Sequence, residues 1–121
     1  MNLPSYKPTY RGNAKQIKQA VSRIKQAERP VLYVGGGAVR SNASAEVAEL
    51  AEVTGAPIVT TLPARGIVPN SNPKALGMLG MHGTVAATAA AQRCDLLVAI
   101  GARFDDRVTG KLDAFAPGAR V

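Results

Sequence analysis

Three short runs of apolar residues, separated by helix-like segments, constrain the fold of this chain more than any other feature. They are residues 30–34 (Pro-Val-Leu-Tyr-Val), 57–61 (Pro-Ile-Val-Thr-Thr) and 95–100 (Asp-Leu-Leu-Val-Ala-Ile). Continuous apolar runs are typical of parallel strands, which are covered on both faces. Strands that alternate with helices predict an α/β fold, a doubly wound, Rossmann-like parallel sheet.

Helices are expected before and between these strands. The first should follow Asn13 as its N-cap and pack one apolar face on a core. That face would carry Ile17, Ala20, Val21, Ile24 and Ala27. A second should run from Ser44, as N-cap, to Gly55, and an Ala-rich third over residues 84–93. We expect an irregular, proline-rich stretch after residue 61, a glycine-rich turn over 77–83 and a short helix near 110–115.

The chain is basic, with 15 Lys and Arg against 8 Asp and Glu and a net charge of +7. Residues 1–29 hold seven basic residues against Glu28 alone, so almost all the excess lies there. No aromatic residues are interleaved for stacking on bases, which favours a solvated helix face over a nucleic-acid surface. We therefore expect no nucleic-acid partner.

Processing and location signals are few. The single Cys94 cannot form an internal disulfide, and its place before an apolar strand predicts a buried, inert thiol. No apolar run of about 18 residues and no charged-then-apolar leader is present, so neither a membrane span nor a secretory signal is expected. A cytoplasmic location follows as the expectation.

Candidate binding residues follow the predicted strands. The segments 35–37 (Gly-Gly-Gly), 61–62 (Thr-Leu) and 101–103 (Gly-Ala-Arg) should meet at one edge of a parallel sheet, where ligands of such sheets bind. Glycines there let backbone amides approach a phosphate, although a plain tight turn explains them equally well. The dinucleotide fingerprint lacks its third glycine at Arg40, so an NAD site is not supported.

The charged residues after the third strand leave alternatives open. Arg103 could pair with a diphosphate, or with Asp105 or Asp106. The flanking arginines favour salt bridges over metal binding by the two aspartates, so we expect no metal site. His82 has no second His or Cys to complete a metal set, and a ligand-wall or structural role is expected. We assign no catalytic residue.

Four stretches together resemble the acetohydroxyacid synthase (acetolactate synthase) family, in its order and spacing. They are residues 2–9 (Asn-Leu-Pro-Ser-Tyr-Lys-Pro-Thr), 33–37 (Tyr-Val-Gly-Gly-Gly), 79–84 (Leu-Gly-Met-His-Gly-Thr) and 101–110 (Gly-Ala-Arg-Phe-Asp-Asp-Arg-Val-Thr-Gly). The similarity covers essentially the whole chain. The Arg-Phe-Asp-Asp-Arg segment at 103–107 is its most specific part, because related thiamine-diphosphate enzymes differ there.

The resemblance implies a role in branched-chain amino-acid biosynthesis. The family's catalytic large subunit is a transferase that joins two pyruvates, or pyruvate and 2-oxobutanoate, using thiamine diphosphate, Mg²⁺ and a FAD that does no net redox chemistry. It has three domains, and the middle one holds FAD. We therefore expect residues 1–12 to be a linker and 13–121 a partial central FAD-binding domain. Its partners would be the subunit's other domains, further copies and a small regulatory subunit.

The resemblance also implies site residues. Gly35, Gly36 and Gly37 would approach the FAD diphosphate and ribityl region. The rest of the FAD wall would be Thr61, Leu62, Leu79, Gly80, Met81, His82, Gly101, Ala102 and Arg103. Met81, His82, Asp106 and Arg107 would lie near the mouth of the substrate channel. Pro63 departs from the family, which often has methionine there, and offers no backbone N–H to a cofactor.

The family's domain continues into a further strand that carries the contacts to the adenosine ribose, so we expect a chain truncated at its C-terminal end. Such a fragment should be inactive alone and should retain FAD weakly or not at all. Two alternatives are the middle domain of another thiamine-diphosphate enzyme, such as a glyoxylate carboligase or pyruvate oxidase, and a free-standing nucleotide-binding module.

Overall fold

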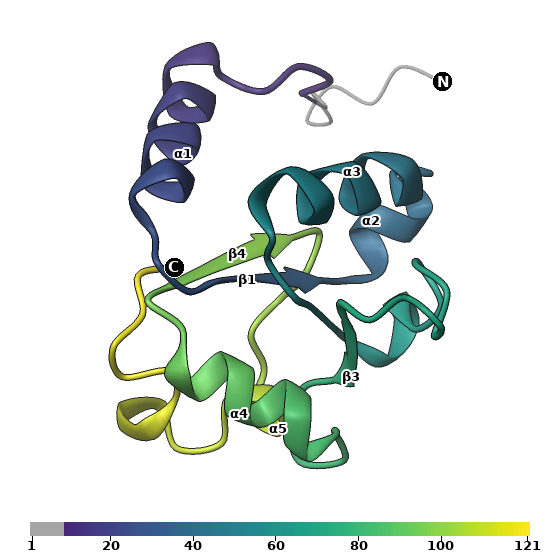
Figure 1. The fold of residues 1–121 in the computed structure, drawn as a ribbon, viewed down its shortest axis with the longest axis vertical. Helices are drawn as coiled ribbons and strands as arrows, with labels where there is room; N and C mark the ends of the chain where they lie inside the picture. Colours follow the sequence, from purple (N-terminus) through teal and green to yellow (C-terminus); the bar gives the residue numbers. More distant parts are fainter. Residues whose placement is uncertain (1–8) are drawn as a thin grey trace, which may run out of the picture.

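The three predicted strands form, and a fourth joins them at one edge of an all-parallel sheet (Figure 1). The structure is a computed structural model that describes residues 9–121. Its strands are β1 (Pro30–Val34), β2 (Ile58–Thr60), β3 (Ala75–Met78) and β4 (Leu96–Ile100), in the order β3-β2-β1-β4. Residues 1–8, which include Pro4, Pro8 and most of the first family stretch, lie outside the described residues.

Helices cover both faces of the sheet, which confirms the doubly wound α/β prediction (Figure 1). On one face, α2 (Gly36–Arg40) and α3 (Ser44–Thr54) enclose a core that includes Leu32. On the other, α4 (Val85–Arg93) and α5 (Asp106–Thr109) enclose a core around Tyr33. Successive residues of β1 thus supply opposite cores, as the twofold repeat of a strand requires.

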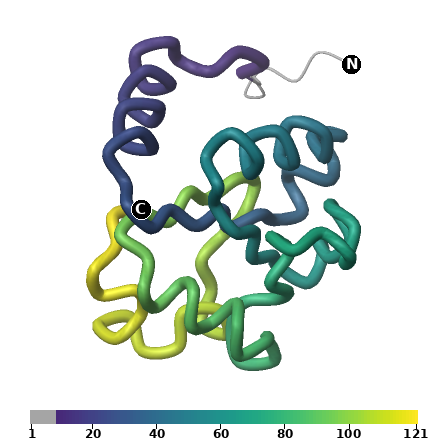
Figure 2. Tube along the Cα trace, viewed as in Figure 1, coloured from purple at the N-terminus to yellow at the C-terminus, as the bar shows by residue number. Residues whose placement is uncertain are grey.

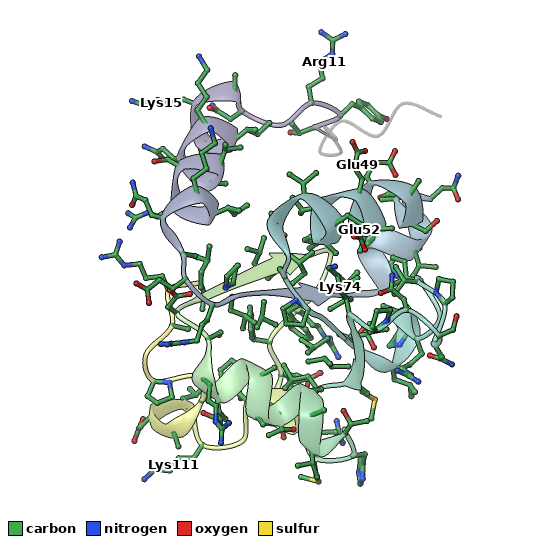
Figure 3. All side chains as sticks on the ribbon, in the orientation of Figure 1. Arg11, Lys15, Glu49, Glu52, Lys74 and Lys111 are labelled. Atoms are coloured by element: carbon green, nitrogen blue, oxygen red, sulfur yellow. The ribbon has the colours of Figure 1, made fainter. Side chains whose placement is uncertain are left out.

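The first helix, α1 (Ala14–Gln26), forms as expected but does not pack as expected. Asn13 caps it by accepting hydrogen bonds from the amides of Lys15 and Gln16. None of its residues is buried, and Ile17 is 53% exposed. Figure 3 shows Lys15 pointing outward from this helix, which agrees with a solvated basic face. The prediction that the apolar face packs on a core is wrong within residues 9–121.

Several local features differ from expectation. Strand β3 spans the end of the stretch expected to be irregular and the start of the expected glycine-rich turn. Its sequence, Ala-Leu-Gly-Met, carries no β-branched residue to signal a strand. The glycines after β1 begin the short helix α2. Helix α3 has Ala43 rather than Ser44 at its N-cap position, and β4 exposes Ala99, so that strand is not covered on both faces along its whole length. Short 3₁₀ turns occupy Leu62–Ala64 and Leu112–Ala114.

The end of α3 and the burial of Cys94 agree with expectation. Gly55 ends α3 in the left-handed conformation at φ 69°, and Thr84 caps α4. Cys94 is buried, and burial, followed by the charge of Asp95, raises the pKa of its thiol. Within residues 9–121 no helix is long and apolar enough to cross a membrane.

Asp95 joins the start of β1 to the start of β4. Its carboxylate accepts hydrogen bonds from the amides of Glu28 at 2.7 Å and Arg29 at 2.9 Å. These bonds, with that of Glu28 the larger cause, hold the pKa of Asp95 below its ordinary value against a smaller opposing effect of desolvation. The Asp95 carbonyl also accepts from Arg120, and Figure 2 shows the C-terminal segment beside the α1–β1 junction.

The first prediction concerns which apolar residues stabilise the fold. Ile58→Ala empties a fully buried position and should lower the free energy of unfolding by about 2–5 kcal/mol. The matched change Ile17→Ala, on α1, should cost less than about 0.5 kcal/mol. Urea unfolding of both variants checks this. Equal losses would mean that the face of α1 is packed after all.

The second prediction concerns Asp95 and pH. A depressed carboxyl pKa contributes stability that is present above the ordinary pKa and lost as pH falls through the lowered one. Asp95→Asn removes the charge, so it should lower the urea midpoint at pH 7, and the difference from wild type should shrink as the pH approaches 3. A difference that stays constant over this range would contradict the assignment.

Candidate functional site

One cavity lies at the carboxyl ends of all four strands. Figure 1 shows the arrowheads of β1 and β4 pointing to the same side of the molecule. The cavity has a volume of about 690 Å³, within the range of small-molecule sites. Because β1 leads to a helix on one face and β4 follows a helix from the other, the cavity lies at the switch point of the sheet.

The structure brings most of the predicted site residues together around this cavity. Those that line it are Gly36, Gly37, Thr61, Leu62, Leu79, Met81, His82, Gly101, Ala102, Arg103 and Arg107. Gly35 is not part of the lining, and Gly80 and Asp106 line a smaller neighbouring cavity of about 250 Å³. Met81 and Arg107 line both cavities, so the expected cofactor and channel residues adjoin one another.

The glycines after β1 allow the loop that follows β1 to lie in close backbone contact with the loop that follows β4. A Cβ on Gly35 would lie 2.4 Å from the Ala102 Cα, and one on Gly37 would lie 2.8 Å from the Gly101 Cα. The amides of Gly35 and Gly37 donate to the carbonyls of Ile100 and Gly101 at 2.9 Å each. Of the three amides, only that of Gly36 has no backbone acceptor among residues 9–121.

A second close contact joins the loop after β3 to α5. The Met81 amide donates to the Arg107 carbonyl at 2.9 Å. A Cβ on Gly80, which has φ 107°, would lie 2.6 Å from that same carbonyl oxygen. This contact places Met81 and His82 beside Arg107, although they are far from it in sequence.

The cavity is electropositive. Its lining carries three arginines, Arg40, Arg103 and Arg107, against the single carboxylate of Asp105. Within residues 9–121, Arg103 forms one ion pair, in which its Nε lies 3.7 Å from an Asp105 carboxylate oxygen. The Arg103 side chain is 87% exposed. Asp105 also caps α5 by accepting from the Val108 amide. The arrangement therefore suits an anionic ligand.

One buried side-chain oxygen in the lining has no hydrogen-bond partner among residues 9–121. The Thr61 hydroxyl oxygen is buried and forms no hydrogen bond within the described residues. A buried hydroxyl without a partner is unfavourable, so a ligand group at this point would stabilise it. Thr61 follows β2 directly, and its amide donates to the Val34 carbonyl, which fixes its position.

Five residues of the lining were not among the predicted site residues: Arg40, Pro63, Met78, Asp105 and Val108. Arg40 follows Gly37 by three residues, and a helix over 36–40 would have placed it near the glycines, but that helix was not predicted. Pro63 occupies the first turn of the 3₁₀ segment, where a backbone N–H is not needed, and lies against Gly36. Within residues 9–121 no group of three or more His, Cys, Asp or Glu could hold a metal ion.

The doubly wound sheet and its strand-end cavity define an α/β protein with a candidate ligand site at the switch point. Residues 17–121 match the family model described as "Thiamine pyrophosphate enzyme, central domain", and the chain belongs to that family.

Curated relatives are more specific. The chain is 60% identical over 121 residues to the acetolactate synthase of Mycobacterium bovis. The matched region is 100% of this chain and 20% of that protein. It is 54% identical to the acetolactate synthase large subunit of Corynebacterium glutamicum, over 100% of this chain and 19% of that protein. It is 50% identical to the probable acetolactate synthase large subunit of Methanocaldococcus jannaschii, over 100% of this chain and 20% of that protein. The resemblance found in the sequence is confirmed, and the chain spans about a fifth of these relatives.

The third prediction tests the glycine contact. Gly37→Ala forces a methyl group against the Gly101 backbone and should lower the free energy of unfolding by about 1–3 kcal/mol. Gly118→Ala is the matched control, because its nearest neighbour would be 3.9 Å away, and it should change stability by less than about 0.5 kcal/mol. Denaturant unfolding of both variants decides. Indistinguishable midpoints would show that the two loops can separate freely.

Proposed function

We propose that this chain is part of the FAD-carrying central domain of an acetolactate synthase large subunit, with residues 1–12 as its linker. The observation that carries the proposal is the electropositive cavity of about 690 Å³ in which most of the residues expected from the resemblance meet. The names of the relatives favour this function over another thiamine-diphosphate enzyme. The whole subunit would condense two pyruvates, or pyruvate and 2-oxobutanoate, in the cytoplasm.

The residues present fit a flavin dinucleotide. Arg103, at the end of β4, offers a cation for the diphosphate, and the unpartnered Gly36 amide and Thr61 hydroxyl offer hydrogen bonds. The apolar side chains of Leu62, Leu79 and Met78 would contact the flat parts of the cofactor. By resemblance, FAD does no net redox chemistry in this family. The chain's own residues would bind and orient it and exclude water.

The opposite end of the cavity would serve the substrate channel. Met81, His82 and Arg107 line the cavity, and Asp106 lines the smaller neighbouring cavity. The hydrogen bond from the Met81 amide to the Arg107 carbonyl would hold these groups in a fixed relation. Thiamine diphosphate and Mg²⁺ would be held by the subunit's other domains, and further copies and a regulatory subunit would be its partners.

The test begins with the full reading frame that contains this chain. The purified full-length subunit, with thiamine diphosphate, Mg²⁺ and FAD supplied, should form acetolactate from pyruvate. The 121-residue chain alone should form none, and flavin fluorescence should show weak FAD binding or none. A full-length product that binds no FAD and condenses no pyruvate would overturn the proposal.

The fourth prediction separates the two arginines of the 103–107 segment in that subunit. Arg103→Ala should weaken FAD binding by about 1.5–3 kcal/mol, because a charge-assisted hydrogen bond is lost. Arg107→Ala should leave the flavin content nearly intact and change the KM for pyruvate. Flavin content and steady-state kinetics measure both effects. Equal flavin loss in the two variants would show that this division of roles is wrong.

A further inference from the structure

Tyr33 lies outside the cavity lining but touches the loop that carries Arg103. It is fully buried near the end of β1, and its hydroxyl donates a hydrogen bond to the Arg103 carbonyl at 3.2 Å. That carbonyl is the hydroxyl's only hydrogen-bond partner among residues 9–121. A buried tyrosine hydroxyl needs a hydrogen-bond partner, and this bond therefore couples the position of the Tyr33 side chain to that of the Arg103 backbone.

The loop has few other supports. Residues 102–105 belong to no helix or strand. Upstream, the Gly37 amide holds the Gly101 carbonyl, and downstream Asp105 caps α5. Between these two points, the bond from Tyr33 is the only hydrogen bond that the described residues make to the backbone of Arg103. The Arg103 side chain cannot supply the missing restraint, because it is 87% exposed and its ion pair is long.

Aromatic contacts extend the same anchor. The Tyr33 ring meets the Phe104 ring at a centroid distance of 5.4 Å, and Phe104 meets Phe115 at 6.0 Å in an edge-to-face arrangement. Such pairs stabilise one relative orientation beyond simple burial. The hydroxyl thus fixes the Arg103 backbone while the ring fixes the next residue, and both act from the rigid centre of the sheet.

The hydroxyl remains a donor under ordinary conditions. Burial, and secondarily the charge of Asp105, raises the pKa of Tyr33 to about 12. The group is therefore protonated across the neutral range and keeps its proton for the Arg103 carbonyl.

We propose that Tyr33 is a positioning residue for the anionic cofactor: its hydroxyl sets the direction in which Arg103 enters the cavity, and it does so without touching the ligand. The proposal rests on the proposed function, because it takes FAD as the ligand. Preorganisation of a cation raises affinity by reducing the cost of ordering it on binding. The hydroxyl's contribution is accordingly expected in the binding constant for FAD.

The test uses Tyr33→Phe in the full-length subunit, stripped of flavin and titrated with FAD by fluorescence. The change removes one oxygen and keeps the ring, so the aromatic contacts persist. The Kd for FAD should rise about 3- to 10-fold, the range expected for one neutral hydrogen bond. Tyr10→Phe is the chemically matched control, since Tyr10 is 89% exposed and far from β1 in sequence, and it should leave the Kd unchanged.

A second control separates positioning from general loss of stability. Val31→Ala removes buried volume on the same face of β1, away from the strand end. It should lower the melting temperature at least as much as Tyr33→Phe and leave the FAD Kd unchanged. If both variants raise the Kd in proportion to their loss of stability, the positioning role is overturned.

A double-mutant cycle gives the sharpest outcome. If Tyr33 acts through Arg103, then Tyr33→Phe should weaken FAD binding in the wild-type background and have little further effect in the Arg103→Ala background. Full additivity would overturn the inference. An unchanged Kd in Tyr33→Phe with a raised Kd in Arg103→Ala would overturn the inference and leave the proposed function standing. An unmodified subunit that binds no FAD would overturn the proposed function itself.

Discussion

The close approach of two backbone segments, Gly35–Gly37 after β1 and Gly101–Ala102 after β4, is the constraint on which the site depends. Neighbouring parallel strands end side by side, but their loops can meet only if no Cβ stands between them. The amide-to-carbonyl bonds of Gly35 and Gly37 then join the loops. The two strands connect to helices on opposite faces, so their adjacent ends form a switch point of the sheet. Apart from Gly35, the residues in this contact also line the cavity there.

The location of the site could be predicted from the sequence better than the structural role of the glycines that form it. The apolar runs located β1, β2 and β4, and parallel pairing then required their ends to share an edge. From the residues alone, the glycines could make room for a phosphate or form a plain tight turn. At Gly35 and Gly37 the structure shows the backbone of another loop in close contact. A glycine in a sequence indicates that something comes close, and only the tertiary structure shows which group it is.

Two other features could not be predicted, for different physical reasons. Strand β3 contains no β-branched residue and depends on pairing with β2, whose register shifts between Ile58 and Val59. Local propensity carries little of that information. Helix α1 shows the reverse case, since periodicity predicted an amphipathic helix but cannot show whether its apolar face is covered, and within residues 9–121 that face is not buried. Propensity determines that a helix forms, and packing determines where its face goes.

The segment from Gly101 to Gly110 illustrates how one short stretch can hold two kinds of function apart. Its Arg103 backbone is tied to Tyr33 in the centre of the sheet, and its Arg107 backbone is tied to Met81 in the loop after β3. Asp105 lies between them and starts α5, so the two halves of the segment follow different supports. The arginines are four residues apart, yet each is positioned by a different strand end. A change in one support would therefore move one arginine and leave the other in place, which is what the proposed division between a cofactor end and a channel end of the cavity requires.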